Sequence, residues 1–364
     1  MNLKIGIVGL PNVGKSTLFN ALTNAGALAA NYPFATIEPN VGIVPVPDER
    51  LDVLAKMYET NKVVPATVEF VDIAGLVAGA SKGEGLGNKF LAHIRECQAI
   101  CHVVRAFKNN DIVRADNKPE DDIVKQAKDD IDIINLELQL ADEETKAKVD
   151  AKRKKDPNDD NIPYLTDKPV IYMFNVDEQG LTDQDLQFRL REVCENCSFA
   201  SIATNGEHLA SEPRDDGRER SGEQKNNFAN HPKAIFVNAK LEEEMSSMSR
   251  AERKEFLKSY GVEHDALEEL IRAAYETLGL QSFLTAGKKE CRAWTIKKGS
   301  TAPEAAGTIH SDFERGFIAA QICNYNDLKE LGSEQAVKAA GKLRTEGKTY
   351  IMQDGDVVEF KFNV

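Results

Sequence analysis

At the start of the chain, apolar residues alternate with other residues. Further along, the apolar residues take the spacing of a helix. Residues 3 to 8 (Leu-Lys-Ile-Gly-Ile-Val) predict a buried strand, and residues 17 to 22 space their apolar side chains like the inner face of a helix. Between them lies Gly9–Ser16, which reads Gly-Leu-Pro-Asn-Val-Gly-Lys-Ser. A strand, a glycine-containing loop and a helix in this order predict a phosphate-binding loop rather than a chance turn.

Apolar runs continue at intervals and predict an α/β fold. The runs that predict further strands are Thr67–Val71, Ile100–Phe107, Pro169–Phe174 and Ala234–Val237. Asp121–Leu140 has helical spacing, and the charged stretch Asp142–Asp160 predicts a solvated helical tip or loop. Two more helices follow, of which the first begins with a capping box of Ser249 and Glu252; Gly261 ends it and Gly279 ends the second.

The pattern beyond Gln281 predicts strands around one helix, which fits a compact β-grasp domain. The predicted elements are a strand at Cys291–Ile296, a turn at Lys297–Gly299, a helix at Glu304–His310, and a hairpin that pairs Tyr350–Met352 with Val357–Phe362 across Asp354–Gly355. Its aromatic residues Trp294, Phe313 and Phe317 are expected in the core rather than on an RNA-stacking surface.

Length and pattern together predict three parts. With 364 residues, the chain is long for a single core. We expect a P-loop domain at 1–115 and 167–280, a helical insertion at 116–166, and the β-grasp domain at 281–364. Residues 196–233, rich in polar and charged side chains, are expected to form a flexible excursion.

Composition and charge limit the cellular location and the partners that we expect for the protein. The chain is 41% hydrophobic and 29% charged, and no apolar run reaches the length of a membrane span, so we expect a cytoplasmic protein without a membrane partner. A net charge of −13 argues against bulk adhesion to nucleic acid, and no DNA partner is expected. The segment after residue 281 is nearly balanced in charge and is the likelier end to meet RNA. Cys194 and Cys197 form a lone CxxC, and reduced thiols are expected.

The glycine-containing loop carries the first candidate site. We expect backbone N–H groups of this loop and the helix N-terminus to surround the phosphates, with Asn12, Val13, Gly14, Lys15, Ser16 and Thr17 as the nucleotide-binding stretch. Lys15 is expected to reach the β- and γ-phosphates, and Ser16 to ligate Mg²⁺. Thr36, in the proline-rich segment Asn31–Asn40, is expected to complete the Mg²⁺ shell.

The second predicted strand ends in Asp72-Ile73-Ala74-Gly75, which fits a Walker B and switch II arrangement. Asp72 is expected to hold Mg²⁺ through water, and the Gly75 amide to sense the γ-phosphate. Leu76 stands where a water-orienting Gln is typical, so intrinsic hydrolysis is expected to be slow. His102, in the next strand, is interpreted as a core histidine.

Base recognition is expected from two strand ends. Asn175-Val176-Asp177-Glu178 departs from the Asn-Lys-x-Asp of GTPases, in which Asp accepts bonds from the two donors of guanine. Here Val176 replaces the lysine, and Glu178 displaces the acceptor by one methylene, which favours adenine. Asn238 and Ala239, before Lys240, stand where a Ser-Ala-Lys type loop contacts the base.

With these motifs assembled, the chain resembles the YchF family of Obg-related ATPases. The resemblance rests on residues 9–17, 31–40, 70–77, 79–88 and 175–178 and on the C-terminal Arg-Ala-Trp-Thr-Ile, Ile-His-Ser-Asp-Phe-Glu-Arg-Gly-Phe and Asp-Gly-Asp-Val-Val-Glu-Phe-Lys-Phe-Asn-Val. It implies a Ras-like domain, an inserted helical arm, a C-terminal TGS domain, ATP preference and association with the ribosome (50S or 70S). Three departures are a short arm, the 196–233 segment, and Arg114 where family members often carry a His.

The leading hypothesis is an Mg²⁺-dependent ATPase that acts as a switch on the ribosome, with catalytic roles for Lys15, Asp72 and Gly75. Ribosomal RNA is a candidate contact of the TGS and helical regions, and Asn12 is a candidate for recruiting K⁺. Two alternatives remain open at this point. One is a GTPase of the Obg type, and the other is a non-catalytic ribosome-binding module that nucleotide only shapes.

Overall fold

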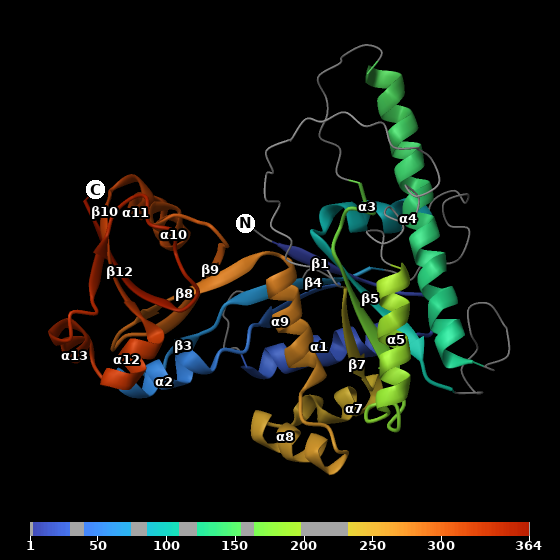
Figure 1. The fold of residues 1–364 in the computed structure, drawn as a ribbon, viewed down its shortest axis with the longest axis horizontal. Coiled ribbons are helices and arrows are strands. Elements are labelled where there is room, and N and C mark those ends of the chain that lie inside the picture. The colour runs from blue at the N-terminus through green and yellow to red at the C-terminus, as the bar shows by residue number, and fades with distance from the viewer. Residues whose placement is uncertain are drawn as a thin grey trace, which may run out of the picture. The chain divides into compact units, whose positions relative to one another are not determined.

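The computed structural model describes residues 3–29, 40–73, 86–108, 122–153, 164–197 and 232–363. The chain forms two compact units (Figure 1). One comprises Lys4–Ala21 and Phe70–Ala266, and the other comprises Met1–Leu3, Leu22–Glu69 and Leu267–Val364. We call them the nucleotide unit and the C-terminal unit. The α/β class predicted from the sequence is confirmed, whereas the exact boundaries of the three expected parts stay a prediction.

The nucleotide unit is built on a sheet whose strands follow the order β4-β1-β5-β6-β7. Strands β1, β5, β6 and β7 run parallel to one another. The strands are β1 (Lys4–Val8), β4 (Thr67–Asp72), β5 (Ala99–Ala106), β6 (Val170–Val176) and β7 (Lys233–Val237). All five were predicted within a few residues. Because parallel strands place their carboxyl ends at one edge of the sheet, the loops that follow them gather there.

Helices separate or follow these strands along the chain. They are α1 (Lys15–Ala29), α3 (Leu86–Glu96), α4 (Ile123–Arg153), α5 (Gln184–Cys197), α7 (Ala239–Glu244) and α8 (Arg250–Ser259), with a 3₁₀ turn at Met245–Ser247. Helices α4 and α5 lie side by side along the sheet (Figure 1) and share a buried cluster with β5 and β6. Helix α4 has 31 residues and extends past the predicted end at Leu140 to Arg153, so part of the charged stretch is helical.

The C-terminal unit holds the β-grasp arrangement expected from the sequence. Strands β8 and β9 pair antiparallel, and the last strand β12 lies between β8 and β10, parallel to β8 and antiparallel to β10. Helix α10 (Ala302–Ile309) packs its alanines against the sheet in a cluster with Phe283, Phe317 and Phe360. The strands are β8 (Leu280–Ala286), β9 (Cys291–Lys297), β10 (Phe317–Asn324), β11 (Arg344–Glu346) and β12 (Asp356–Phe362).

The remaining elements of this unit are short. They are β2 (Val41–Pro45), α2 (Glu49–Met57), β3 (Val63–Val64), α9 (Ala266–Thr277), α10 (Ala302–Ile309), α11 (Ser311–Arg315), α12 (Tyr325–Leu331) and α13 (Glu334–Ala339). Strand β3 extends the sheet by pairing with β9. Phe317 is buried as expected, and Trp294 and Phe313 pack half-buried against the same core.

The hairpin predicted at the end of the chain is wrong. Strand β12 pairs with β10 and β8, whereas Ile351 forms an isolated bridge with Thr301. The turn itself is real, since Gly355 has a φ of 81°, but its N–H donates to the carbonyl of Ser282 in β8. The turn therefore directs β12 into the centre of the sheet instead of back onto residues 350–352.

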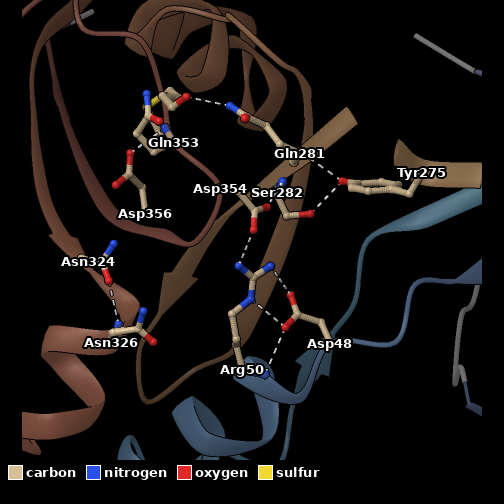
Figure 2. A network of polar contacts seen from close by, with 11 residues as sticks. Asp48, Arg50, Tyr275, Gln281, Ser282, Asn324, Asn326, Gln353, Asp354 and Asp356 are labelled. Atoms are coloured by element: carbon tan, nitrogen blue, oxygen red, sulfur yellow. Dashed lines mark hydrogen bonds and ion pairs between the residues drawn. The ribbon is translucent and has the colours of Figure 1, made fainter. Parts of the chain in front are cut away.

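A polar network joins segments of the C-terminal unit that lie far apart in the sequence (Figure 2). The guanidinium of Arg50 donates to Asp48 at 2.8 Å and to Asp354 at 2.7 Å. The second carboxylate oxygen of Asp354 accepts the Ser282 N–H at 2.9 Å. Asp48 also caps α2 by accepting the N–H of Arg50. The network therefore fixes the start of α2 to the turn that precedes β12.

Candidate functional site

The P-loop lies between β1 and α1, as predicted, and its backbone is shaped by two residues with positive φ. Asn12 has a φ of 64° and Gly14 a φ of 93°, and α1 begins directly afterwards at Lys15. Gly9 is also required, because a Cβ there would lie 2.6 Å from the carbonyl oxygen of Val103. This conformation turns successive N–H groups of the loop toward one concavity at a helix N-terminus, the arrangement that binds phosphate.

Lys15 and Asp72 form an ion pair at this site. Lys15 is only 8% exposed, and the Asp72 carboxylate at the end of β4 pairs with its ammonium group. The Lys of the P-loop and the strand-end Asp, which were identified separately in the sequence, are therefore brought together. Ser16 is exposed at the first turn of α1, and Thr17 is half-buried.

Asn175 connects the P-loop to the loop after β7. Its side-chain amide Nδ2 donates to the carbonyl of Val13 at 2.9 Å, and its Oδ1 accepts the N–H of Ala239 at 3.0 Å. The residue is buried, and a Cβ added to Gly14 would collide with its amide nitrogen. Asn175 thus holds the P-loop and the loop after β7 at a fixed separation, a role that the sequence did not indicate.

The other residues of the motif at positions 175–178 lie partly in the core and partly on the surface. The side chain of Val176 is 1% exposed and packs in the cluster formed by α4, α5 and the sheet, so only its backbone is available to a ligand. Asp177 accepts the N–H of Gly180 at 2.9 Å and so stabilises the following turn. Glu178 is exposed at this turn, where its carboxylate is accessible to a ligand.

Asn238 and Ala239 lie where the second base-contacting loop was expected. Asn238 is the N-cap of α7, and its Oδ1 accepts the Leu241 N–H at 3.0 Å. Ala239 is buried, and its Cβ would lie 3.5 Å from a Cβ placed on Gly14. Asn238 therefore orders the loop, while Ala239 contacts the P-loop side of the site.

Other predicted residues of the site fall elsewhere. Thr36, Gly75, Leu76 and Arg114, and the 196–233 segment except its ends, lie outside the described residues. Within the described part of the chain, no group of three or more His, Cys, Asp or Glu side chains is placed to hold a metal ion. Of the Mg²⁺ ligands expected from the sequence, Ser16 and Asp72 lie within the described residues.

Two residue types that suggested alternative chemistry are part of the core. His102 is fully buried, and burial lowers its pKa to about 3, so it is neutral at physiological pH. All six cysteines are buried and free. Burial raises the pKa of Cys197 to about 11 and also raises that of Cys194, which makes both thiols of the CxxC poor nucleophiles.

The fold and this site define a P-loop NTPase with an additional C-terminal β-grasp domain. The family model described as "50S ribosome-binding GTPase" matches residues 4–189, and YchF-GTPase_C, described as a protein of unknown function, matches residues 280–363. The chain belongs to the YchF family.

Relatives of similar length support this assignment. The chain is 44% identical to the "Ribosome-binding ATPase YchF" of Haemophilus influenzae and 44% identical to that of Bacillus subtilis, in each case over 402 aligned positions that cover all of both chains. The solved structure of the Schizosaccharomyces pombe YchF GTPase matches with a TM-score of 0.69 and 32% identity, covering 99% of this chain and 98% of that one. In the described part of this chain, no helix is both long and apolar enough to cross a membrane.

Proposed function

We propose that this protein is a cytoplasmic Mg²⁺-dependent ATPase that acts as a nucleotide-controlled switch on the ribosome. The observation that carries the proposal is the Asn175 amide, which ties the P-loop to α7 beside the Lys15–Asp72 pair. This arrangement brings together the residues for which we propose phosphate, metal and base contacts. The names of the bacterial relatives support ATP and the ribosome as ligand and partner.

In the proposed reaction, Lys15 exchanges its contact with Asp72 for the β- and γ-phosphates, which leaves the Asp72 carboxylate to face the metal. Ser16 and Thr36, with Asp72 acting through water, would hold the Mg²⁺ ion, which would supply charge neutralisation at the transferring phosphate. Catalysis of this kind is mostly positioning and electrostatic stabilisation. The Gly75 amide is proposed to sense the γ-phosphate and to transmit its presence to the following loop.

The proposed preference for ATP over GTP rests on the residues that are expected to contact the base. Guanine presents two adjacent donors that a single aspartate accepts in GTPases, whereas adenine presents one exocyclic amine. Here Glu178 is exposed at the turn after β6, and the neighbouring Val176 is committed to the core. Competition of ATP and GTP for a fluorescent ATP analogue tests this preference. We expect ATP to bind more tightly, and a tenfold preference for GTP, about 1.4 kcal/mol, would contradict the proposal.

A GTPase is the second candidate, because the matched family model and the fission yeast structure are both described as GTPases. The same competition experiment separates the two. A monovalent cation is a further proposal: Asn12 lies in the P-loop with its backbone in the left-handed region. Turnover measured in K⁺ and in Na⁺ tests it, and equal rates would contradict a role for K⁺.

Association with the ribosome is tested by sedimentation of the full chain with 50S and 70S particles. We expect co-sedimentation to depend on whether ADP, ATP or a non-hydrolysable analogue is present, because the γ-phosphate shifts the population of the switch loops. Single-turnover phosphate release should also become faster when ribosomes are added. Binding that is identical in all nucleotide states would contradict the switch, and turnover that ribosomes leave unchanged would favour a non-catalytic binding module.

A further inference from the structure

A buried ion cluster lies behind the base-facing loop of the nucleotide unit. Arg253 of α8 donates from Nη2 to Glu242 of α7 at 2.7 Å and lies 2.8 Å from Asp265, which also accepts the Arg253 Nε at 2.9 Å. Glu242 and Arg253 are 3% and 7% exposed. We call these three residues the Arg253 cluster. Because buried charges are costly when unpaired, the cluster fixes its three segments relative to one another.

The opposite end of α7 contacts the nucleotide site. Ala239, the first residue of this helix, donates its N–H to Asn175, which in turn donates to the P-loop carbonyl of Val13. Helix α7 has only six residues, and Glu242 lies three positions after Ala239, which is about one helical turn. A displacement of Glu242 therefore moves Ala239 and the loop before it.

The geometry of the Arg253 cluster fixes the orientation of its two carboxylates. A guanidinium is a planar fork whose donors are fixed relative to each other, so two carboxylates bound to one fork are held in a defined orientation. Lysine offers a single ammonium on a flexible stem and does not reproduce this geometry. The cluster is also separate from the phosphates, since none of its members belongs to the P-loop or to the metal-facing residues.

We propose that Arg253 is a positioning residue for purine recognition: through Glu242 it holds α7 so that Asn238 and Ala239 stand at the correct distance from the P-loop. The inference rests on the proposed function, because it assumes that the site binds a purine nucleotide. It adds a residue that contacts neither base nor phosphate yet controls discrimination between bases.

The test compares R253K with E242Q in the full chain. Glutamine keeps the acceptor oxygen and nearly the size of Glu242, so E242Q is the matched control. Dissociation constants are measured by calorimetry in Mg²⁺ for ATP, GTP and inorganic tripolyphosphate. We expect R253K to weaken ATP binding about tenfold and to bring the dissociation constants of ATP and GTP close to each other. The dissociation constant of tripolyphosphate should stay within twofold of the wild-type value. E242Q should retain most of the discrimination.

Tripolyphosphate binding also reports whether the P-loop of each variant is folded, which a loss of ATP binding alone does not. If R253K does not fold, E242A removes the carboxylate that links the guanidinium to α7 and carries the same expectation. Equal weakening of all three ligands, or unchanged discrimination in a folded variant, would overturn the role of Arg253. A wild-type chain that binds tripolyphosphate but neither purine nucleotide would instead contradict the proposed function.

Discussion

At Gly14, the backbone and its neighbours both exclude a side chain. Its φ of 93° is in the left-handed region, and a Cβ would collide with the amide of Asn175. We predict that G14A weakens MgATP binding at least tenfold, about 1.4 kcal/mol, because Asn175 must move and release the P-loop from α7. Calorimetric titration measures the effect. G287A is the control, since a Cβ at Gly287 meets nothing within 4 Å, and wild-type affinity in G14A would contradict the prediction.

Glu242 gives the stability of the protein a pH dependence. Burial and the nearby Asp265 carboxylate raise its pKa to about 7 from an ordinary value of 4.5, against the opposing effect of Arg253. Between these two values the folded chain keeps a proton that the unfolded chain releases. We therefore predict that the contribution of Glu242 to the free energy of unfolding falls as pH rises from about 4.5 to 7 and is constant above that.

Urea unfolding of the wild type and of E242Q at pH 5 and pH 7.5 measures this contribution. Other titrating groups affect both proteins equally, so the difference between their pH dependences isolates Glu242. The wild type should lose more stability between the two pH values than E242Q does. Identical pH dependences would show that Glu242 titrates at its ordinary value in the folded protein.

Single residues of the site were predictable where a motif defines their chemistry. Lys15 and Asp72 were identified separately and do meet in the structure. That Asn175 holds two loops together was not predictable from the sequence. An Asn at a strand end has the same local sequence pattern whether its amide contacts a base or two neighbouring loops. Its partners, Val13 and Ala239, are distant in the sequence and close only once the sheet has formed.

Among the elements, helix α5 allows a test of how much its buried face and its exposed face each contribute to the free energy of unfolding. Leu190 is fully buried against α4 and the sheet, whereas Phe188 on the same helix is 60% exposed. We predict that L190A lowers the free energy of unfolding by about 2 to 5 kcal/mol, because it removes buried methyl groups and leaves a cavity. F188A should change it by no more than about 0.5 kcal/mol. Denaturant unfolding measures both, and similar losses would contradict the burial of Leu190.

Elements defined by local signals were predicted well. The capping box of Ser249 and Glu252 begins α8, and the glycines at 261 and 279 have positive φ where the helices end. The C-terminal hairpin was not, although its Asp-Gly turn exists. A turn signal shows where the chain reverses, but the identity of the partner strand depends on contacts with β8 and β10 that lie far away in the sequence.

For the molecule as a whole, Arg50 is the residue whose loss should be felt across the C-terminal unit. Its guanidinium joins Asp48 at the start of α2 to Asp354 before β12. We predict that R50M lowers the free energy of unfolding by about 1 to 2 kcal/mol, since the Asp48 carboxylate is largely buried and loses its partner, while Asp354 is half-exposed and regains water.

The control for R50M is R315M. Arg315 pairs with Asp312 but its side chain is 76% exposed, and such surface pairs contribute about 0 to 1 kcal/mol. Thermal unfolding followed by circular dichroism compares the two variants. A shift in R50M no larger than that in R315M would show that the network is not a stabilising tie.

The central position of β12 has a consequence for how the C-terminal unit folds. Leu284 of β8 pairs with Val357 of β12, about 70 residues later in the sequence, whereas β8 and β9 are joined by a short connection. The β8–β9 ribbon can form early, but loop-closure entropy opposes the pairing with β12 until the intervening segment has collapsed. Refolding of this unit should therefore be limited by the docking of its last strand, and until then the inner edges of β8 and β10 stay open to pairing with other chains.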